Sequence, residues 1–94
     1  MNTQPYTIAI IQARMSSSRL PGKVLRDIAG KPMLAHVVQR TQSALRVHQV
    51  VVATTTDETD DSVAEFCLNN KIVCFRGSMH DVLDRYYQAA QQYQ

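Results

Sequence analysis

The sequence predicts an α/β domain with a parallel sheet. Short apolar runs without internal Gly or Pro alternate three times with segments of helical periodicity along the 94 residues. This alternation is typical of parallel strands joined by right-handed helical crossovers. The composition, 45% hydrophobic and 19% charged, is ordinary for a globular chain. We therefore expect residues 1–94 to form about three strands and three helices that belong to one domain.

The first third of the chain predicts a strand, a long loop and a helix. Residues 6–13 (YTIAIIQA) have the β-branched, apolar character of a strand buried on both faces. Residues 14–31 show no clear periodicity, and irregular segments of this length are usually functional. Helical periodicity begins at Pro32, a residue type favoured in a first turn. Its expected buried face consists of Leu34, Val37, Val38, Thr41 and Leu45.

The middle of the chain predicts a second strand and a second helix. Residues 49–53 (QVVVA) read as a buried strand, and the TTTDETDD segment after it offers N-cap residues and first-turn acids. The helix then places Val63, Phe66 and Cys67 on one face. We expect it to end near residues 69–70, because Asn tolerates the left-handed conformation that closes helices.

The last part of the chain predicts a third strand and a third helix. Residues 72–75 (IVCF) form the strand. Ser78 followed by Asp81 has the spacing of a capping box, so the helix should begin there. Its apolar stripe, interpreted as core, consists of Val82, Leu83, Tyr86, Ala89, Ala90 and Tyr93.

Three segments follow the carboxyl ends of the expected strands, where ligands of open parallel sheets bind. They are residues 14–31, 54–56 and 76–77, and they should meet at one rim. Five of the ten basic residues fall in the first segment, where Asp27 is the only acid. This clustering favours a compact anionic ligand, with a merely solvated basic loop as the alternative.

The basic loop has the chemistry of a polyphosphate site. Arg14, Arg19 and Lys23 place three positive charges within ten residues, and Gly22 lets the backbone approach a ligand. Arg can hold phosphate oxygens bidentately, while Lys acts as a point charge. A Walker loop is excluded because Ser17 and Val24 stand where it needs Gly and Ser or Thr. With only three dispersed glycines, a dinucleotide fingerprint is excluded too.

Other functional classes find little support. A net charge of +2 does not indicate nucleic acid or an anionic membrane. No apolar run approaches a membrane span and no signal peptide is evident, so we expect a cytoplasmic protein. Cys67 and Cys74 lack metal or redox spacing. The three histidines, interpreted as structural or solvated, are His36, His48 and His80.

Three motifs together resemble one family. They are IIQARMSSSRLPGKVLRDIAGKPMLAHVVQR, VVATTTDETDD and FRGSMHDVLDRYYQAA, and the similarity as a whole extends from Ile8 to about Ala90. The first is similar to the opening of the sugar-activating cytidylyltransferases, including acylneuraminate and keto-deoxy-octulosonate cytidylyltransferases. The other two resemble most the branch called spore coat polysaccharide biosynthesis protein F. The resemblance implies a Rossmann-like three-layer fold of the nucleotide-diphospho-sugar transferase type.

The resemblance also implies a reaction and a set of site residues. A sugar oxygen would attack the α-phosphorus of CTP and release pyrophosphate, in cell-surface polysaccharide biosynthesis. Arg14, Arg19 and Lys23 would act catalytically by stabilising the leaving charge. Ala13 and Arg14 match contacts to base and phosphate, and Thr54 is a candidate by position alone. The expected nucleotide-binding residues are Ala13, Arg14, Ser18, Arg19, Gly22, Lys23, Thr54, Arg76, Gly77 and Asp81.

The resemblance further implies Mg²⁺, which the family holds with an aspartate in a D-x-P-L segment. No such segment occurs in this chain, and Asp27, Asp57 and Asp60 do not match it. We therefore assign no metal ligand here, and enzyme activity of these 94 residues stays undecided. Two hypotheses remain open. In the first, residues 1–94 are the N-terminal, CTP-binding portion of a larger cytidylyltransferase domain, expected to form a homo-oligomer. In the second, the chain is a truncated, non-catalytic homo-oligomeric fragment with weak or vestigial nucleotide binding.

Overall fold

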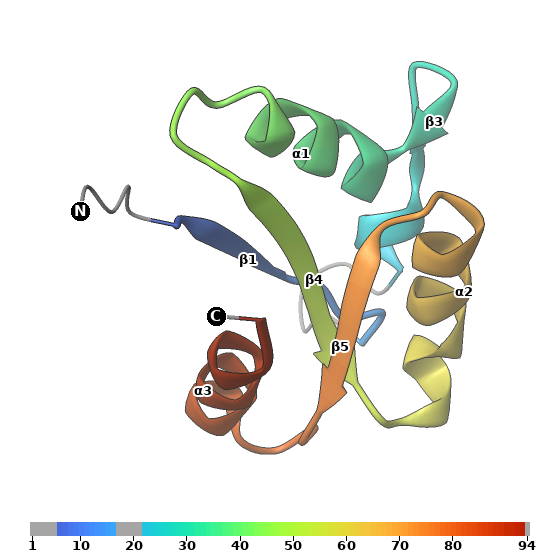
Figure 1. Ribbon diagram of the computed structural model, residues 1–94. Coiled ribbons are helices and arrows are strands. Elements are labelled where there is room, and N and C mark those ends of the chain that lie inside the picture. Colours follow the sequence, from blue (N-terminus) through green and yellow to red (C-terminus); the bar gives the residue numbers. More distant parts are fainter. Residues whose placement is uncertain (1–5, 17–21, 94) are drawn as a thin grey trace.

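A parallel sheet forms the middle layer of the computed structural model, which describes residues 6–16 and 22–93 (Figure 1). Its described strands are β1 (Ile8–Gln12), β4 (Gln49–Thr55) and β5 (Val73–Gly77), in the order β1-β4-β5. Both pairings are parallel: Gln12 lies opposite Ala53, and Thr55 lies opposite Gly77. The α/β class and the parallel sheet are therefore confirmed.

Helices cover both faces of this sheet. Helices α1 (Met33–Gln42) and α2 (Asp61–Asn69) lie on one side, and α3 (Val82–Tyr93) lies on the other (Figure 1). Because successive residues of a strand point to opposite faces, β4 supplies side chains to both layers. Val50 and Val52 pack with α1 and α2 in the main core, together with Ala13, Leu34, Val38, Val63 and Cys67. The Rossmann-like three-layer arrangement is confirmed.

The segment expected to be wholly irregular contains short regular elements. A 3-10 turn, η1, spans Lys23–Leu25, and a small antiparallel ladder joins β2 (Asp27–Ile28) to β3 (Lys31–Pro32). Ala29 (φ 53°) and Gly30 (φ 90°) form the turn between them, where two positive φ angles are typical of a tight hairpin. Strands of two residues are too short to show alternation, so these two could not be predicted from the residue pattern.

Helix α1 is shorter than the sequence predicts at both ends. Pro32 is its N-cap with ψ 147°, so the helix begins one residue later at Met33. The helix ends at Gln42, and Leu45 lies beyond it, fully exposed. The expectation that Leu45 belongs to the buried face was wrong, because the apolar period continued past the last helical turn.

Helix α2 begins and ends near the expected positions, but its end has a different chemistry. A 3-10 turn, η2 (Glu58–Asp60), precedes it, with Asp57 as the cap that accepts a hydrogen bond from the backbone N–H of Thr59. The left-handed residue after the helix is Lys71 (φ 58°), whereas Asn70 has φ −108°. Asn70 instead donates its side-chain amide to the carbonyl of Phe66 at 2.8 Å.

Helix α3 turns a different face to the sheet from the one expected. Its buried residues are Arg85 and Ala89, while Leu83 is 81% exposed and Val82 and Tyr86 are also exposed. The interpretation of the whole apolar stripe as core was therefore wrong. Asp81 caps the helix by accepting from the backbone N–H of Asp84 at 2.9 Å, without the capping box expected from Ser78.

The helices in the described part of the chain are short. None of them combines the length and the apolar character that crossing a membrane requires.

Candidate functional site

The carboxyl ends of β1, β4 and β5 meet at one rim, as the topology requires. Backbone hydrogen bonds hold the ends together: Ala13 N–H donates to Ala53 at 3.0 Å, and Thr56 N–H donates to Gly77 at 3.1 Å. The loops that leave these strands therefore start side by side. This is the edge where open parallel sheets bind ligands.

The basic loop closes on itself at its base. Gly22 N–H donates to the carbonyl of Met15 at 2.7 Å, so these two parts of the basic loop lie beside each other. Gly22 has φ 79°, a left-handed conformation that glycine adopts without steric cost. Its position is open, since an added Cβ would come no closer than 3.8 Å to the Met15 side chain. The backbone conformation, more than crowding, therefore calls for glycine here.

Arg14 and Lys23 stand on the two sides of this closure. Arg14 is half-buried, and its Nη2 donates to the hydroxyl of Ser16 at 3.1 Å. Its Nε is buried without a partner among residues 6–16 and 22–93. Lys23 is exposed at the start of η1. Ser18 and Arg19 lie outside the described residues.

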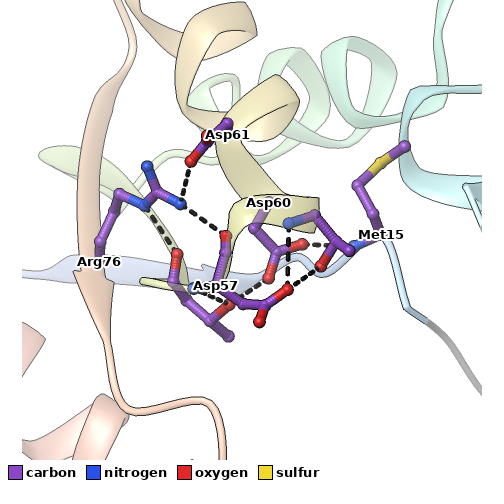
Figure 2. Close-up of polar contacts among 7 residues, drawn as sticks. Met15, Asp57, Asp60, Asp61 and Arg76 are labelled. Atoms are coloured by element: carbon purple, nitrogen blue, oxygen red, sulfur yellow. Dashed lines mark hydrogen bonds and ion pairs between the residues drawn. The ribbon is translucent and has the colours of Figure 1, made fainter.

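Asp60 anchors the loop, and sequence reasoning missed it. Its side chain is only 1% exposed, Oδ1 accepts from the backbone N–H of Met15 at 2.7 Å, and Oδ2 accepts from the Thr55 hydroxyl (Figure 2). One carboxylate thus ties the start of the basic loop to the end of β4 and the start of α2. In the sequence Asp60 sits in an acidic run that reads as a solvated first turn, so no local signal singled it out.

Arg76 is engaged by the protein itself. Its Nε donates to the carbonyl of Thr55 at 2.7 Å, and Nη2 donates to the carbonyl of Asp57 and to Asp61 Oδ1, both at 2.9 Å (Figure 2). Asp61 with Arg76 is the one ion pair in the described part of the chain. The guanidinium therefore braces the loop between β4 and α2, a role that the sequence did not suggest.

The other expected site residues outside the basic loop, Gly77, Asp81 and Thr54, contribute to packing, helix capping and the buried end of β4. An added Cβ at Gly77 would lie 2.9 Å from a ring carbon of Phe75 and 3.1 Å from Arg85 Cγ, so glycine permits the close approach of α3. Asp81 is exposed and caps α3. Thr54 is fully buried, and its hydroxyl has no partner within the described ranges.

The electrostatics of the rim are set by hydrogen bonds and burial. The hydroxyl and then the backbone N–H of Thr59 donate to the carboxylate of Asp57 and hold its pKa below the ordinary value. Burial lowers the pKa of Arg85, and the positive charge of Arg14 lowers it further. The described residues contain no group of three His, Cys, Asp or Glu side chains that could hold a metal ion.

The fold and the rim together define a class: α/β proteins that bind a ligand beyond the carboxyl ends of a parallel sheet, here with a basic loop suited to phosphates. Comparison with known families makes the assignment specific. A family model described as cytidylyltransferase matches residues 8–94. The chain therefore belongs to the cytidylyltransferase family.

Individual relatives agree with this assignment. The chain is 43% identical over 88 residues to a 3-deoxy-manno-octulosonate cytidylyltransferase of Bradyrhizobium, covering 94% of the chain and 35% of the relative. It is 42% identical over 81 residues to the spore coat polysaccharide biosynthesis protein SpsF of Bacillus subtilis, covering 82% and 34%. The solved structure of CMP:2-keto-3-deoxy-manno-octonic acid synthetase complexed with CTP matches with a TM-score of 0.74 at 32% identity, covering 96% and 36%. The chain thus spans about a third of the length of its relatives.

Proposed function

We propose that this chain is the CTP-binding part of a cytidylyltransferase that activates a sugar for cell-surface polysaccharide biosynthesis. CMP is transferred from CTP to a sugar oxygen, and pyrophosphate leaves. Membership of the family supports the reaction class. A structural neighbour complexed with CTP supports the nucleotide.

One observation carries the proposal: the basic loop is closed and anchored at the sheet rim. The Met15–Gly22 hydrogen bond fixes Arg14 and Lys23 at the base of the loop, and Asp60 fixes that base to β4. Two cations held in this way bind phosphate oxygens with less loss of conformational entropy than cations on an unanchored loop. In the transfer step they stabilise the negative charge that develops on pyrophosphate, together with Arg19.

Mg²⁺ would supply further neutralisation of that leaving charge. The described residues offer no cluster for it, so no step is assigned to the metal through them. What these residues supply is the binding and orientation of the nucleotide, which places the α-phosphorus for in-line attack.

Titration calorimetry with CTP and Mg²⁺ tests the proposal. Arg14→Ala and Lys23→Ala should each weaken CTP binding by about 1–3 kcal/mol, the size of a lost charge-assisted hydrogen bond. Arg46→Ala removes the same charge from an exposed position beyond the end of α1 and serves as the control. Equal CTP dissociation constants in the wild type and both loop variants would reject the assignment of the loop. A folded wild type that binds no CTP at millimolar concentration would favour the non-catalytic homo-oligomeric fragment instead.

A further inference from the structure

The side chain of Arg85 is buried between the end of β1 and the segment after β5, and it forms no ion pair with a described carboxylate. It lies in α3 with 1% of its surface exposed, and no ion pair involves it within the described residues. Its Nε donates to Gln12 Oε1 at 2.6 Å, and its Nη1 donates to the carbonyl of Ser78 at 2.6 Å. Its direct acceptors are neutral oxygens, and the negative charge of Asp60 acts on it without forming an ion pair. Burying a guanidinium in this way is costly, so its position calls for an explanation.

This arrangement fixes the orientation of the Gln12 amide. A guanidinium has only donors, so the amide atom that faces Arg85 must be the oxygen. The amide nitrogen then points elsewhere, and it can only donate. Gln12 Nε2 is buried and finds no acceptor in residues 6–16 or 22–93. Buried polar atoms without a partner are rare in native proteins, so each one calls for an explanation.

A second unpaired donor lies on the same side of the rim. Gln12 ends β1 opposite Ala53, and this face of β4 is the one turned toward α3, because Val52 packs on the opposite face. Arg14 follows two residues later and is close enough for its charge to act on Arg85. Its Nε is also a buried donor without a partner in the part of the chain that the structure describes. The Thr54 hydroxyl belongs to the opposite face, since it neighbours Ala53 along the strand, and it is not part of this group.

We propose that Gln12 reads the nucleobase: its amide nitrogen donates to N3 of cytosine, which is an acceptor. Arg85 is the positioning residue that keeps the amide nitrogen turned toward the base. The inference rests on the proposed function and adds the determinant of nucleotide choice. Uracil carries N–H at position 3, so the same amide nitrogen would meet a donor there, and UTP binds less tightly than CTP.

A base fits this place better than a phosphate group does. Side-chain amides recognise base edges through directed hydrogen bonds and carry no charge to balance a phosphate. The guanidinium of Arg85 already donates to Gln12 and to the carbonyl of Ser78, so these donors are not free to bind a phosphate group. The exposed Lys23, in contrast, is available on the loop for the phosphates.

The ratio of the dissociation constants for UTP and CTP is the test. In the wild type CTP should bind roughly tenfold more tightly than UTP, the scale of one matched base contact. Gln12→Glu keeps the link to Arg85 but replaces the donor with an acceptor, so the preference should fall at least tenfold or reverse. Both ligands are triphosphates, so the added charge affects them alike and cancels in the ratio. Gln91→Glu, the same change at an exposed position of α3, should leave the ratio unchanged.

Arg85→Lys tests the positioning role, because an ammonium cannot reproduce the two directed contacts of the guanidinium. The ratio should fall toward one in this variant, a readout that a purely structural role would not move. If Arg85→Lys does not fold, Gln12→Glu still decides the question. Equal binding of CTP and UTP by the wild type, or an unchanged ratio in Gln12→Glu, overturns the inference and leaves the proposed function standing. A folded wild type that binds neither nucleotide overturns both.

Discussion

Replacing Asp60 with alanine should loosen the rim more than any other single change at the β4–α2 loop. The carboxylate is almost fully buried and accepts hydrogen bonds from the backbone of Met15 and the hydroxyl of Thr55. Asp60→Ala removes both acceptors at once. The N–H of Met15 and the O–H of Thr55 would then be left without partners, or would have to admit water.

The magnitude follows from these contacts. A hydrogen bond to a charged group contributes about 1.5–3 kcal/mol, so two contribute about 3–6 kcal/mol. Part of this is offset because the variant no longer buries a carboxylate. We expect a net loss of about 2–4 kcal/mol in the free energy of unfolding. For a domain of this size that corresponds to a fall in Tm of about 10–30 °C.

Urea unfolding of the wild type, Asp60→Ala and Asp60→Asn measures the effect. Asparagine can accept from Met15 through its oxygen and donate to Thr55 through its nitrogen, so Asp60→Asn should cost only about 1 kcal/mol. CTP affinity, measured where all three proteins are folded, should fall in Asp60→Ala because the loop base is no longer held to β4. If Asp60→Ala unfolds at the same urea concentration as the wild type, Asp60 does not anchor the loop.

Three further predictions follow from individual contacts. Hydrogen bonds from Thr59 lower the pKa of the Asp57 carboxyl group. The extra stability of the wild type over Asp57→Asn should therefore be fully present above the unfolded pKa near 3.8 and be lost as the pH falls through the lower folded pKa. A difference in Tm between the two proteins that stays constant from pH 2 to 7 would contradict this. A hydrogen bond from the Cys67 thiol to Cys74 lowers the pKa of Cys74 and raises the pKa of Cys67, so iodoacetamide should modify Cys74 first. Cys67→Ala removes this donor and should shift the reaction of Cys74 to higher pH, whereas Cys67→Ser should not. Equal labelling of the two thiols in the wild type would contradict the prediction. Gly77→Ala brings a methyl group within 2.9 Å of a ring carbon of Phe75 and should lower the free energy of unfolding by about 1–3 kcal/mol. An unchanged denaturation midpoint would show that the neighbouring side chains can move away without loss of stability.

The sequence predicted the features of this protein that depend on neighbouring residues. Strands β1, β4 and β5 were recognisable because each is a short, continuous apolar run. The basic loop was recognisable because Arg14 and Lys23 lie close together in the chain, and charge clustering needs no knowledge of the fold. The convergence of the loops followed from the parallel topology alone.

The features that the sequence did not reveal depend on contacts across the fold. Asp60 meets Met15 across 45 residues, and Arg85 meets Gln12 across 73 residues, so neither has a local pattern. An arginine among apolar helix residues reads as solvated, although the sheet buries this one. The orientation of α3 was predicted wrongly, because its apolar stripe was expected to face the sheet, whereas the helix buries Arg85 and Ala89 instead.

The long spacing of these rim contacts has a consequence for how the protein is made. A ribosome releases the basic loop early, yet the partner that orients Gln12 emerges only when α3 has been synthesised. Contacts between distant positions also close late in folding, since the entropy of the intervening chain must first be lost. The nascent chain therefore carries the positive charges of the basic loop for some time before the contact between Gln12 and Arg85 can form.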